Sequence, residues 1–301
     1  TTPSAITPTE EHPDLARELG VNALYLKRED LHPLGSHKGR SIPHMIDMHI
    51  ENEGIKRFVI SGTGNASLAA LRYCKQLNSA ASDAGALIYL EIIVGKNIAP
   101  HKLKRLENES AGLPFISITH NDRPLQTLFV KTQDPTVRGL RQSVDAAALA
   151  GYASLGKELM AIPDLQAVFV GTSSGTTAQA LAECFHKNGS KAEVHIIQTP
   201  SCHPMTDAFE STPLTDEKSI ADAIVDKVAA RKEALITAVK KTGGRGWVAV
   251  NDRIREAQEL TSKYAGLDIS SNSALSIAGV MEAVYSGKEW SGAVACIICG
   301  E

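Results

Sequence analysis

The chain has 301 residues, of which 43% are hydrophobic and 22% are charged, so it can form one large globular domain or two of ordinary size. Its formal net charge of -3 gives no reason to expect nucleic acid or an anionic membrane surface as a partner. No window approaches 18 uninterrupted apolar residues, which argues against a transmembrane span.

The start of the chain and its cysteines bear on where the protein works. The sequence begins Thr1-Thr2-Pro3, with no methionine and no signal-peptide pattern, so we expect a trimmed or partial chain. Five cysteines without framework spacing fit a reducing cytoplasm, where we expect the protein to act. Cys296 and Cys299 lie in an apolar run that predicts a buried strand, and residues three apart on a strand face opposite sides. We therefore expect core packing for both thiols and no metal site.

Short apolar runs alternate with longer helical patterns along most of the chain. The predicted strands cover residues 24–27, 57–60, 87–94, 114–118, 166–170, 193–198, 247–250 and 293–298. The predicted helices cover residues 38–52, 65–77, 101–108, 176–187, 227–241, 252–264 and 273–286. This alternation predicts an α/β protein with parallel sheets covered by helices on both faces. In such sheets ligands bind at the carboxyl ends of strands, in the loops that lead into helices.

The first such loop follows the strand at 24–27. The chain breaks at Pro33 and Gly35 and restarts as a helix behind Ser36, which places Lys38 in the first turn. The backbone N–H groups there are unpaired and the helix dipole is positive, so a charged ammonium is disfavoured. A neutral, positioned lysine amine is what Schiff-base chemistry requires. Lys38 is therefore a candidate catalytic residue, although the pattern alone also fits a solvated lysine at a helix start.

The second loop, residues 61–67, follows the strand at 57–60 and reads Ser-Gly-Thr-Gly-Asn-Ala-Ser. Its glycines let the backbone approach a ligand. Thr63, Asn65 and the start of the next helix offer hydrogen bonds to an anion such as a carboxylate. An ordinary capped turn would contain the same residues, so this loop alone leaves both readings open.

The third loop, residues 171–177, follows the strand at 166–170 and reads Gly-Thr-Ser-Ser-Gly-Thr-Thr. Glycines and hydroxyl residues before a helix form a phosphate cradle of backbone amides and hydroxyl donors. The loop lacks the lysine of a P-loop and the G-x-G-x-x-G spacing of a dinucleotide site. It therefore predicts a site for the phosphate of a small cofactor.

A fourth segment, residues 268–274, precedes the last predicted helix and reads Asp-Ile-Ser-Ser-Asn-Ser-Ala. Its simplest interpretation is a cluster of helix N-cap residues. A short neutral hydroxyl such as that of Ser270 would also suit a pyridine nitrogen that has to stay unprotonated.

The order of these four motifs resembles that of the fold-type II pyridoxal-phosphate enzymes, the superfamily of tryptophan synthase β, threonine synthase, cysteine synthase and serine/threonine dehydratase. The resemblance extends from about residue 20 to the C-terminus. Residues 26–31, Leu-Lys-Arg-Glu-Asp-Leu, are especially similar to tryptophan synthase β. The resemblance implies pyridoxal 5′-phosphate (PLP) as the cofactor.

The resemblance also implies roles for individual residues. Lys38 would be the Schiff-base lysine and proton shuttle, Asn65 would bind the 3′-oxygen of the cofactor, and Ser270 would face its pyridine nitrogen. His37 would contact the phosphate. The residues implied around the substrate carboxylate are Thr63, Gly64, Asn65 and Ala66. The residues implied to hold the phosphate are Gly171, Thr172, Ser173, Ser174, Gly175 and Thr176.

The architecture implied by the resemblance is two three-layer α/β/α domains with mostly parallel sheets. Residues 1–45 and 150–301 would form the large PLP-binding domain, and residues 46–149 the smaller substrate-side domain. A homodimer is implied as well.

The implied activity is that of a PLP-dependent lyase, with elimination or replacement on a small L-amino acid. The Thr63 loop looks more like threonine synthases than dehydratases, which usually place histidine after the asparagine. The end of the last strand, residues 297–300, looks more dehydratase-like. A serine/threonine dehydratase (ammonia-lyase), a β-replacement synthase of the cysteine or tryptophan synthase type, and a non-catalytic PLP-fold binding protein remain as alternatives.

Overall fold

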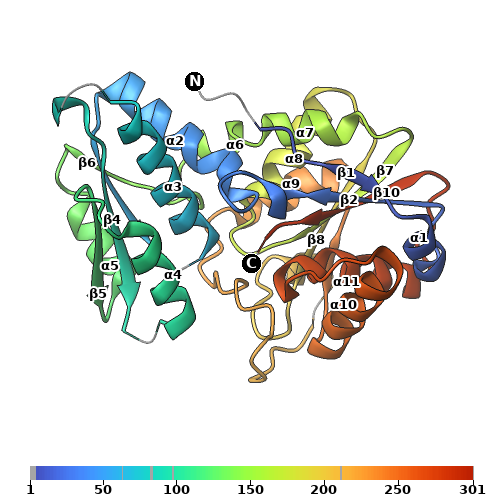
Figure 1. Cartoon of the computed structure of the whole chain (residues 1–301). Helices are drawn as coiled ribbons and strands as arrows, with labels where there is room; N and C mark the ends of the chain where they lie inside the picture. The colour runs from blue at the N-terminus through green and yellow to red at the C-terminus, as the bar shows by residue number, and fades with distance from the viewer. Residues whose placement is uncertain (1–4, 63, 82–83, 97, 211, 301) are drawn as a thin grey trace. The chain divides into compact units, whose positions relative to one another are not determined.

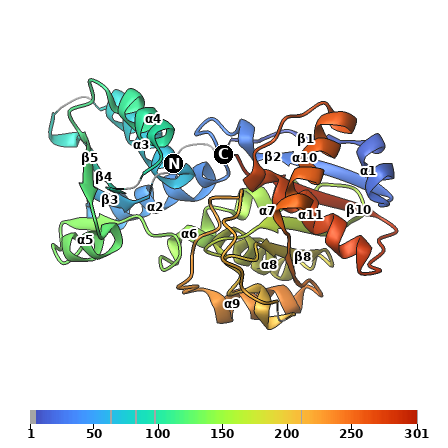
Figure 2. The ribbon, with the colours of Figure 1, turned by 90° about the horizontal axis from the view of Figure 1, so that it is seen from below.

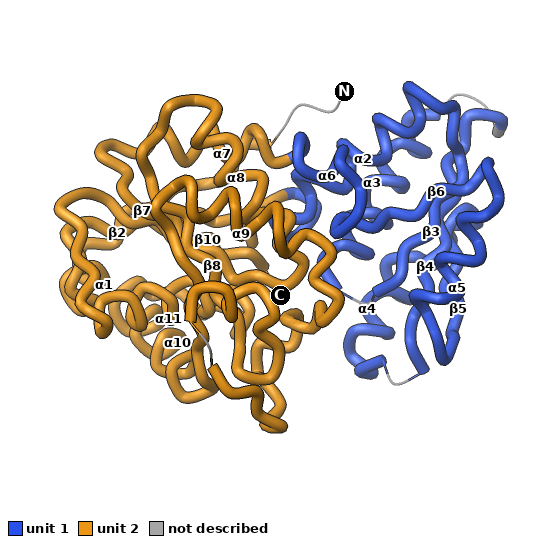
Figure 3. Tube along the Cα trace, turned by 180° about the vertical axis from the view of Figure 1, so that it is seen from behind, with its two compact units in different colours: residues 1–4, 33–151 blue, residues 5–32, 152–301 orange. Residues whose placement is uncertain are grey.

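The computed structural model describes residues 5–62, 64–81, 84–96, 98–210 and 212–300, and these form two compact units (Figure 3). Unit 1 contains residues 33–151, and unit 2 contains residues 5–32 and 152–300. The predicted domain boundary at residue 45 falls inside helix α2 (Lys38–Glu53), which lies wholly in unit 1. Residues 33–45 therefore group with the smaller unit, because a continuous helix packs as one body.

Unit 1 is built on a four-stranded sheet in the order β5-β4-β3-β6, in which all neighbours are parallel (Figure 1). Its strands are β3 (Arg57–Ser61), β4 (Tyr89–Gly95), β5 (Ile116–Asn121) and β6 (Val137–Gly139). Its helices are α2, α3 (Asn65–Ser79), α4 (Pro100–Ser110), α5 (Pro124–Lys131) and α6 (Ala147–Ala150), with a 3-10 turn at Ala84–Ala86.

The two faces of this sheet differ in their covering. Phe58 of β3 belongs to a buried cluster with Ile42 of α2 and Leu71 of α3. The next residue, Val59, points to the other face and packs with Leu128 of α5. Successive strand residues alternate between the two faces of a sheet. The contacts of β3 therefore show that α2 and α3 cover one face and α5 lies on the other.

The α5 face departs from the prediction of full covering on both sides. Three side chains on this face are exposed, namely Arg57 on β3, Tyr89 on β4 and Ser117 on β5. A short helix of eight residues cannot cover four strands, and the strands carry polar side chains where it does not reach.

Unit 2 is built on a six-stranded sheet in the order β1-β2-β10-β7-β8-β9. Strand β1 lies antiparallel to β2, and all other neighbours are parallel. The strands are β1 (Thr9–Glu11), β2 (Ala23–Arg28), β7 (Leu165–Gly171), β8 (Glu193–Gln198), β9 (Gly246–Val248) and β10 (Ala293–Ile298). The helices are α1 (Pro13–Leu19), α7 (Ala153–Met160), α8 (Thr176–Lys187), α9 (Lys232–Lys241), α10 (Asn251–Ala265) and α11 (Ser271–Tyr285), with 3-10 turns at Glu29–Leu31 and Thr206–Ala208.

Helices cover both faces of the unit 2 sheet. Helices α1, α10 and α11 lie on one face and α7, α8 and α9 on the other (Figures 1 and 2). Right-handed crossovers explain this arrangement, because the chain moves outward through β7, β8 and β9 and then returns across the sheet to β10. The predicted α/β class with mostly parallel sheets is confirmed. No helix in the described part of the chain is long and apolar enough to cross a membrane.

The predicted helix at 227–241 is wrong over its first residues, since α9 begins only at Lys232. The preceding residues form a tight turn in which Asp226 accepts hydrogen bonds from the backbone N–H groups of Val228 and Ala229. Ala229 has a φ of 50°, outside the helical range. An aspartate that binds the backbone ahead of it favours a turn over a helix.

Lys27 on β2 is fully buried and forms the most enclosed ion pair of unit 2 among the described residues. Its Nζ donates to the backbone oxygen of Thr7 at 2.6 Å, to Oγ1 of Thr9 at 3.1 Å and to Oε2 of Glu158 at 2.6 Å. All three ammonium donors therefore have acceptors. The pair joins the N-terminal segment and α7 to the central sheet.

We expect Lys27→Met to lower the free energy of unfolding by about 3–5 kcal/mol, because it leaves the Glu158 carboxylate without its buried cation. Urea unfolding followed by circular dichroism measures this loss. Arg17→Met is the control, since the Arg17–Asp14 pair is exposed and contributes little. Equal stability of the two variants would contradict a structural role for Lys27.

A second charged cluster surrounds Glu193 at the start of β8. His195, Lys288 and Trp290 donate to its carboxylate at 2.9 to 3.1 Å. Burial raises the pKa of Glu193, but these hydrogen bonds outweigh burial and lower it to about 2. His195 also accepts a hydrogen bond from Trp247 Nε1 on its other ring nitrogen, and burial lowers its pKa. The imidazole is therefore neutral and the carboxylate ionised in the folded protein.

This cluster should make the protein less stable in acid. The folded-state pKa of Glu193 lies below its unfolded value, so its contribution is complete above pH 4.5 and is lost as the pH falls toward 2. Glu193→Gln should therefore be less stable than wild type at pH 6, and the difference should shrink between pH 4.5 and 2. Urea midpoints across this range measure it, with the exposed Glu233→Gln as control. A difference that is constant with pH would contradict this assignment.

Candidate active site

The predicted catalytic lysine is the first residue of α2, in unit 1. Its backbone N–H lies 3.3 Å from Oγ of Ser36, and its side chain is half-buried. His37 occupies the N-cap position without a side-chain capping bond. The predicted position of Lys38 in the first helical turn is confirmed.

The backbone before and after Lys38 is held tightly. Gly35 has a φ of 89°, a conformation that side chains other than glycine rarely adopt. Ser41 Oγ donates to the backbone oxygen of Ala148 at 2.8 Å. A Cβ at Gly151 would lie 2.6 Å from the Ser41 Cα, so α2 and the end of α6 touch backbone to backbone. The start of α2 is therefore a fixed element of unit 1.

The predicted carboxylate loop is also in unit 1, where it joins β3 to α3. Asn65 is the first residue of α3, and Gly64 is its N-cap. Ser67 Oγ donates to the backbone oxygen of Gly62 at 2.8 Å, which closes the turn. Asn65 and Ala66 are half-buried within the first turn of the helix, where backbone N–H groups lack helical partners. Thr63 lies outside the described residues.

The predicted phosphate loop is in unit 2, where it joins β7 to α8. Thr172 is buried, its N–H donates to Ile197, and its hydroxyl donates to the backbone oxygen of Val170. Both donors of Thr172 are thus used within the fold. Ser173 Oγ instead accepts from the N–H groups of Val225 and Asp226, at 3.2 and 3.3 Å.

This arrangement fits a phosphate group. Within the described part of the chain the hydroxyl proton of Ser173 is not engaged, so it can be donated to a ligand. The hydroxyls of Ser174 and Thr176 lie 3.0 Å apart, and only one of them can donate to the other. The first N–H groups of α8 follow directly. Hydroxyl and amide donors in this loop match the small-cofactor phosphate that the sequence predicts.

Gly175 and Gln198 hold this loop in shape. Gly175 has a φ of 79°, and a Cβ there would lie 2.8 Å from Leu235 and 3.1 Å from the Met205 sulfur. The Gln198 side chain donates to the backbone oxygen of Thr172 and accepts from the N–H groups of Met205 and Thr206. The loop after β8 therefore supports the loop after β7, an interaction that the sequence alone did not reveal.

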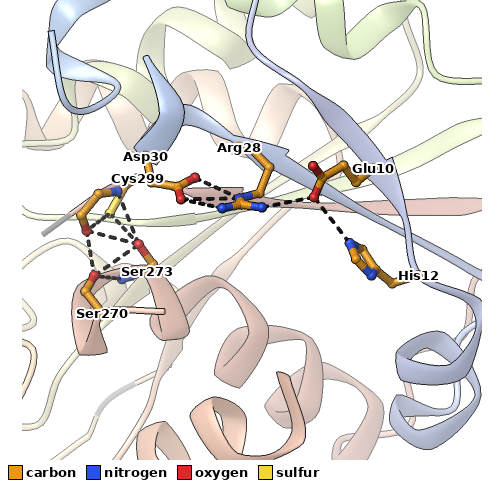
Figure 4. Close-up of polar contacts among 8 residues, drawn as sticks. Glu10, His12, Arg28, Asp30, Ser270, Ser273 and Cys299 are labelled. Carbon is orange, nitrogen blue, oxygen red and sulfur yellow. Dashed lines mark hydrogen bonds and ion pairs between the residues drawn. The ribbon is translucent and has the colours of Figure 1, made fainter. Parts of the chain in front are cut away.

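Ser270 is the N-cap of α11 in unit 2, as the simplest interpretation of its segment predicts. Its Oγ accepts from the N–H of Ser273 at 3.1 Å and donates to the backbone oxygen of Gly300 at 2.5 Å (Figure 4). Gly171 lies against the start of the same helix, since a Cβ there would be 3.1 Å from the Asn272 oxygen. The structure thus brings Ser270 and the phosphate loop to one edge of the unit 2 sheet.

Cys299 differs from its prediction as a core thiol. Cys296 is fully buried in β10, and burial raises its pKa. Cys299 lies beyond the end of β10, is half-buried, and has its sulfur 3.7 Å from Oγ of Ser273 (Figure 4). Strand β10 ends at Ile298, as the predicted strand at 293–298 does, so Cys299 lies in the loop that follows it. Its place after a strand end was the signal available in the sequence.

Arg28, the last residue of β2, forms ion pairs with two acidic side chains (Figure 4). Arg28 Nη2 lies 2.8 Å from Oδ2 of Asp30, and its Nη1 lies 3.1 Å from Oε2 of Glu10. Asp30 is the main reason that the pKa of Arg28 is raised. Among the described residues, no group of three or more histidine, cysteine or acidic side chains could hold a metal ion.

The whole chain matches one protein family. A family model described as "Pyridoxal-phosphate dependent enzyme" covers residues 1–300. The threonine synthase of Methanosarcina acetivorans is 24% identical over 297 residues, covering 93% of this chain and 70% of that protein. The threonine synthase of Mycobacterium tuberculosis is 25% identical, covering 97% and 79%. Bovine L-serine dehydratase/L-threonine deaminase is 26% identical, covering 75% and 68%.

Solved structures share the fold. A pyridoxal 5′-phosphate-dependent aspartate racemase superposes with a TM-score of 0.80 at 20% identity, covering 98% of this chain and 90% of that one. The processed form of threonine deaminase isoform 2 from Solanum lycopersicum gives a TM-score of 0.78 at 19% identity, covering 98% and 79%. With the family match over residues 1–300, the chain belongs to the pyridoxal-phosphate-dependent enzymes of fold-type II, and its cofactor is PLP.

Proposed function

We propose that this protein catalyses PLP-dependent elimination or replacement on a small L-amino acid, with threonine synthase-like chemistry. The observation that carries the proposal is the position of Lys38 as the first residue of α2, the place that the resemblance assigns to the Schiff-base lysine. The curated threonine synthases that match over more than nine-tenths of the chain support the same choice.

Lys38 is the residue we assign to hold the cofactor and to move the substrate proton. PLP, when bound, supplies an electron sink for negative charge at the substrate α-carbon. The Lys38 Nζ would accept the α-proton and return a proton later, as a general base and acid. The fixed backbone at the start of α2 would limit the positions that this amine can reach.

The start of α3 is the proposed site for the substrate carboxylate. Its first-turn N–H groups and partial positive charge favour an anion there. Gly64, Asn65 and Ala66 lie at that helix start, with Asn65 also proposed to bind the 3′-oxygen of the cofactor. We extend the proposal to Thr63 on the resemblance alone.

For the phosphate we propose the loop from Gly171 to Thr176, with its hydroxyl donors at Ser173, Ser174 and Thr176. Thr172 would support the loop rather than donate to the ligand, because both of its donors are engaged. His37 stays a proposed second contact to the phosphate.

The residues around Ser270 bear on the type of reaction. Ser270, Ser273 and Cys299 form a cluster of hydroxyl and thiol groups without a carboxylate among them. We propose that Ser270 faces the pyridine nitrogen and leaves it unprotonated, which favours elimination and replacement over transamination. A carboxylate there would instead stabilise a protonated ring.

A serine/threonine dehydratase is the second candidate. The bovine relative with that printed activity matches 75% of the chain, and the tomato structure is a threonine deaminase. The two candidates differ in the step after the leaving group departs, since a synthase adds a nucleophile and a dehydratase releases ammonia and a keto acid. We also propose that the enzyme acts in the cytoplasm, as its five cysteines without framework spacing indicate. A homodimer is proposed because the resemblance implies one.

Lys38→Ala should abolish covalent attachment of the cofactor. We expect purified wild-type protein to show a visible absorbance band from lysine-bound PLP, and the variant to lose it and at least about 10²–10⁴-fold of its activity. Lys75→Ala on the exposed side of α3 is the matched control and should keep both. A wild-type protein that stays colourless with added PLP would refute the proposed function.

The substrate can be identified with a panel read by absorbance and by product. Phosphate release and threonine formation from O-phosphohomoserine are expected of a threonine synthase. Ammonia and keto-acid release from serine or threonine would instead identify a dehydratase, and sulfide-dependent turnover of O-acetylserine a β-replacement synthase. Chiral analysis of the recovered amino acids would detect racemisation, the activity named for one structural neighbour. A visible band without a change on any substrate would favour a non-catalytic binding protein.

A further inference from the structure

Arg72 on α3 forms a bidentate ion pair with Glu109 on α4. Its Nε and Nη2 each lie 2.7 Å from a different oxygen of Glu109 on α4. Two parallel hydrogen bonds fix the plane of a guanidinium, which a single contact would leave free to rotate. Both side chains are about one-quarter exposed, so the pair is partly shielded from water.

The third guanidinium nitrogen of Arg72 lies against the loop that carries the proposed catalytic lysine. A Cβ built on Gly35 would be 2.1 Å from Nη1 of Arg72, so the guanidinium fills the space that a side chain at this position would occupy. Gly35 also requires its φ of 89°. Arg72 thus packs directly on the Gly35 backbone, three residues before Lys38.

The residues on either side of Gly35 connect the Arg72 contact to Lys38. Leu34 is buried in the core cluster of unit 1, and Ser36 is buried with its Oγ near the Lys38 N–H. The loop therefore has little freedom to shift between the core and the guanidinium. A change at Gly35 would move the first turn of α2 directly.

Helix α3 also carries Asn65, the residue proposed to bind the 3′-oxygen of the cofactor. Asn65 and Arg72 are seven residues apart, which places them on the same face of the helix, about 10 Å apart along its axis. One rigid helix therefore joins the proposed cofactor contact at its start to the support of the lysine loop two turns later.

We propose that Arg72, oriented by Glu109, is a positioning residue that sets Lys38 relative to Asn65 through its contact with Gly35. This inference rests on the proposed function, since it assigns Lys38 and Asn65 to the same cofactor. Arg72 itself is assigned no contact with substrate or cofactor.

The test compares Arg72→Met with Arg105→Met. Arg105 Nε lies 3.6 Å from the same Glu109 carboxylate, so its loss removes a charge next to Glu109 but leaves the Arg72–Gly35 contact intact. The measurements are PLP affinity by absorbance titration of the cofactor-free protein, the pH profile of the bound-cofactor spectrum, and the thermal midpoint. We expect Arg72→Met to bind PLP about tenfold more weakly, with a shifted pH profile, a loss of the size known for residues that support metal ligands. Arg105→Met should match wild type in PLP affinity and in the pH profile.

The outcomes separate this inference from the proposed function. If Arg72→Met lowers only the thermal midpoint, or if Arg105→Met has the same effect on PLP, the positioning role is wrong while the proposed function stands. If wild-type protein does not bind PLP, both fail. Should Arg72→Met not fold, Glu109→Gln and Gly35→Ala test the same contact from its two sides, and unchanged PLP affinity and pH profile in both would overturn the inference.

Discussion

The chemistry proposed for this protein depends on the starts of four helices. Helices α2, α3, α8 and α11 begin at or beside each of the predicted functional segments. The partial positive charge at a helix start favours an anion, which suits the carboxylate and phosphate proposed for α3 and α8. Parallel sheets supply such positions repeatedly, because each strand leads into a helix at the same edge.

Close backbone packing keeps these helix starts in place. Gly35 lies against Arg72, Gly151 lies against Ser41, and Gly175 lies against Leu235 and Met205. In each case a Cβ would overlap a neighbour, so glycine permits the contact. Gly35 and Gly175 also have the positive φ that glycine adopts readily. A reactive group must be held within a fraction of an ångström to act, and dense packing of this kind provides that restraint.

The buried charges of unit 2 illustrate a different use of ionic groups. Lys27 has an acceptor for each of its ammonium donors, and Glu193 receives three side-chain donors. Such saturated groups stabilise the fold but are unsuited to chemistry, because their partners must be lost before they react. Lys38 lies only eleven residues after Lys27, yet it begins a helix and is half-buried rather than enclosed in the sheet. The contrast separates a structural lysine from a candidate catalytic one.

The sequence by itself determined the α/β alternation, the loops at strand ends and the helix start at Lys38, because hydrophobic periodicity and glycine or hydroxyl turns are local signals. It missed short elements such as β1, β6 and α7, whose few residues carry little periodicity. Only the tertiary structure decided three contacts. Both donors of Thr172 form hydrogen bonds within the fold, and Ser270 donates to Gly300, thirty residues away. Arg72 packs against Gly35. These contacts depend on partners that are distant in the chain. The identity of a residue shows that it carries a hydroxyl or a guanidinium, but it does not show which group that side chain contacts in the fold.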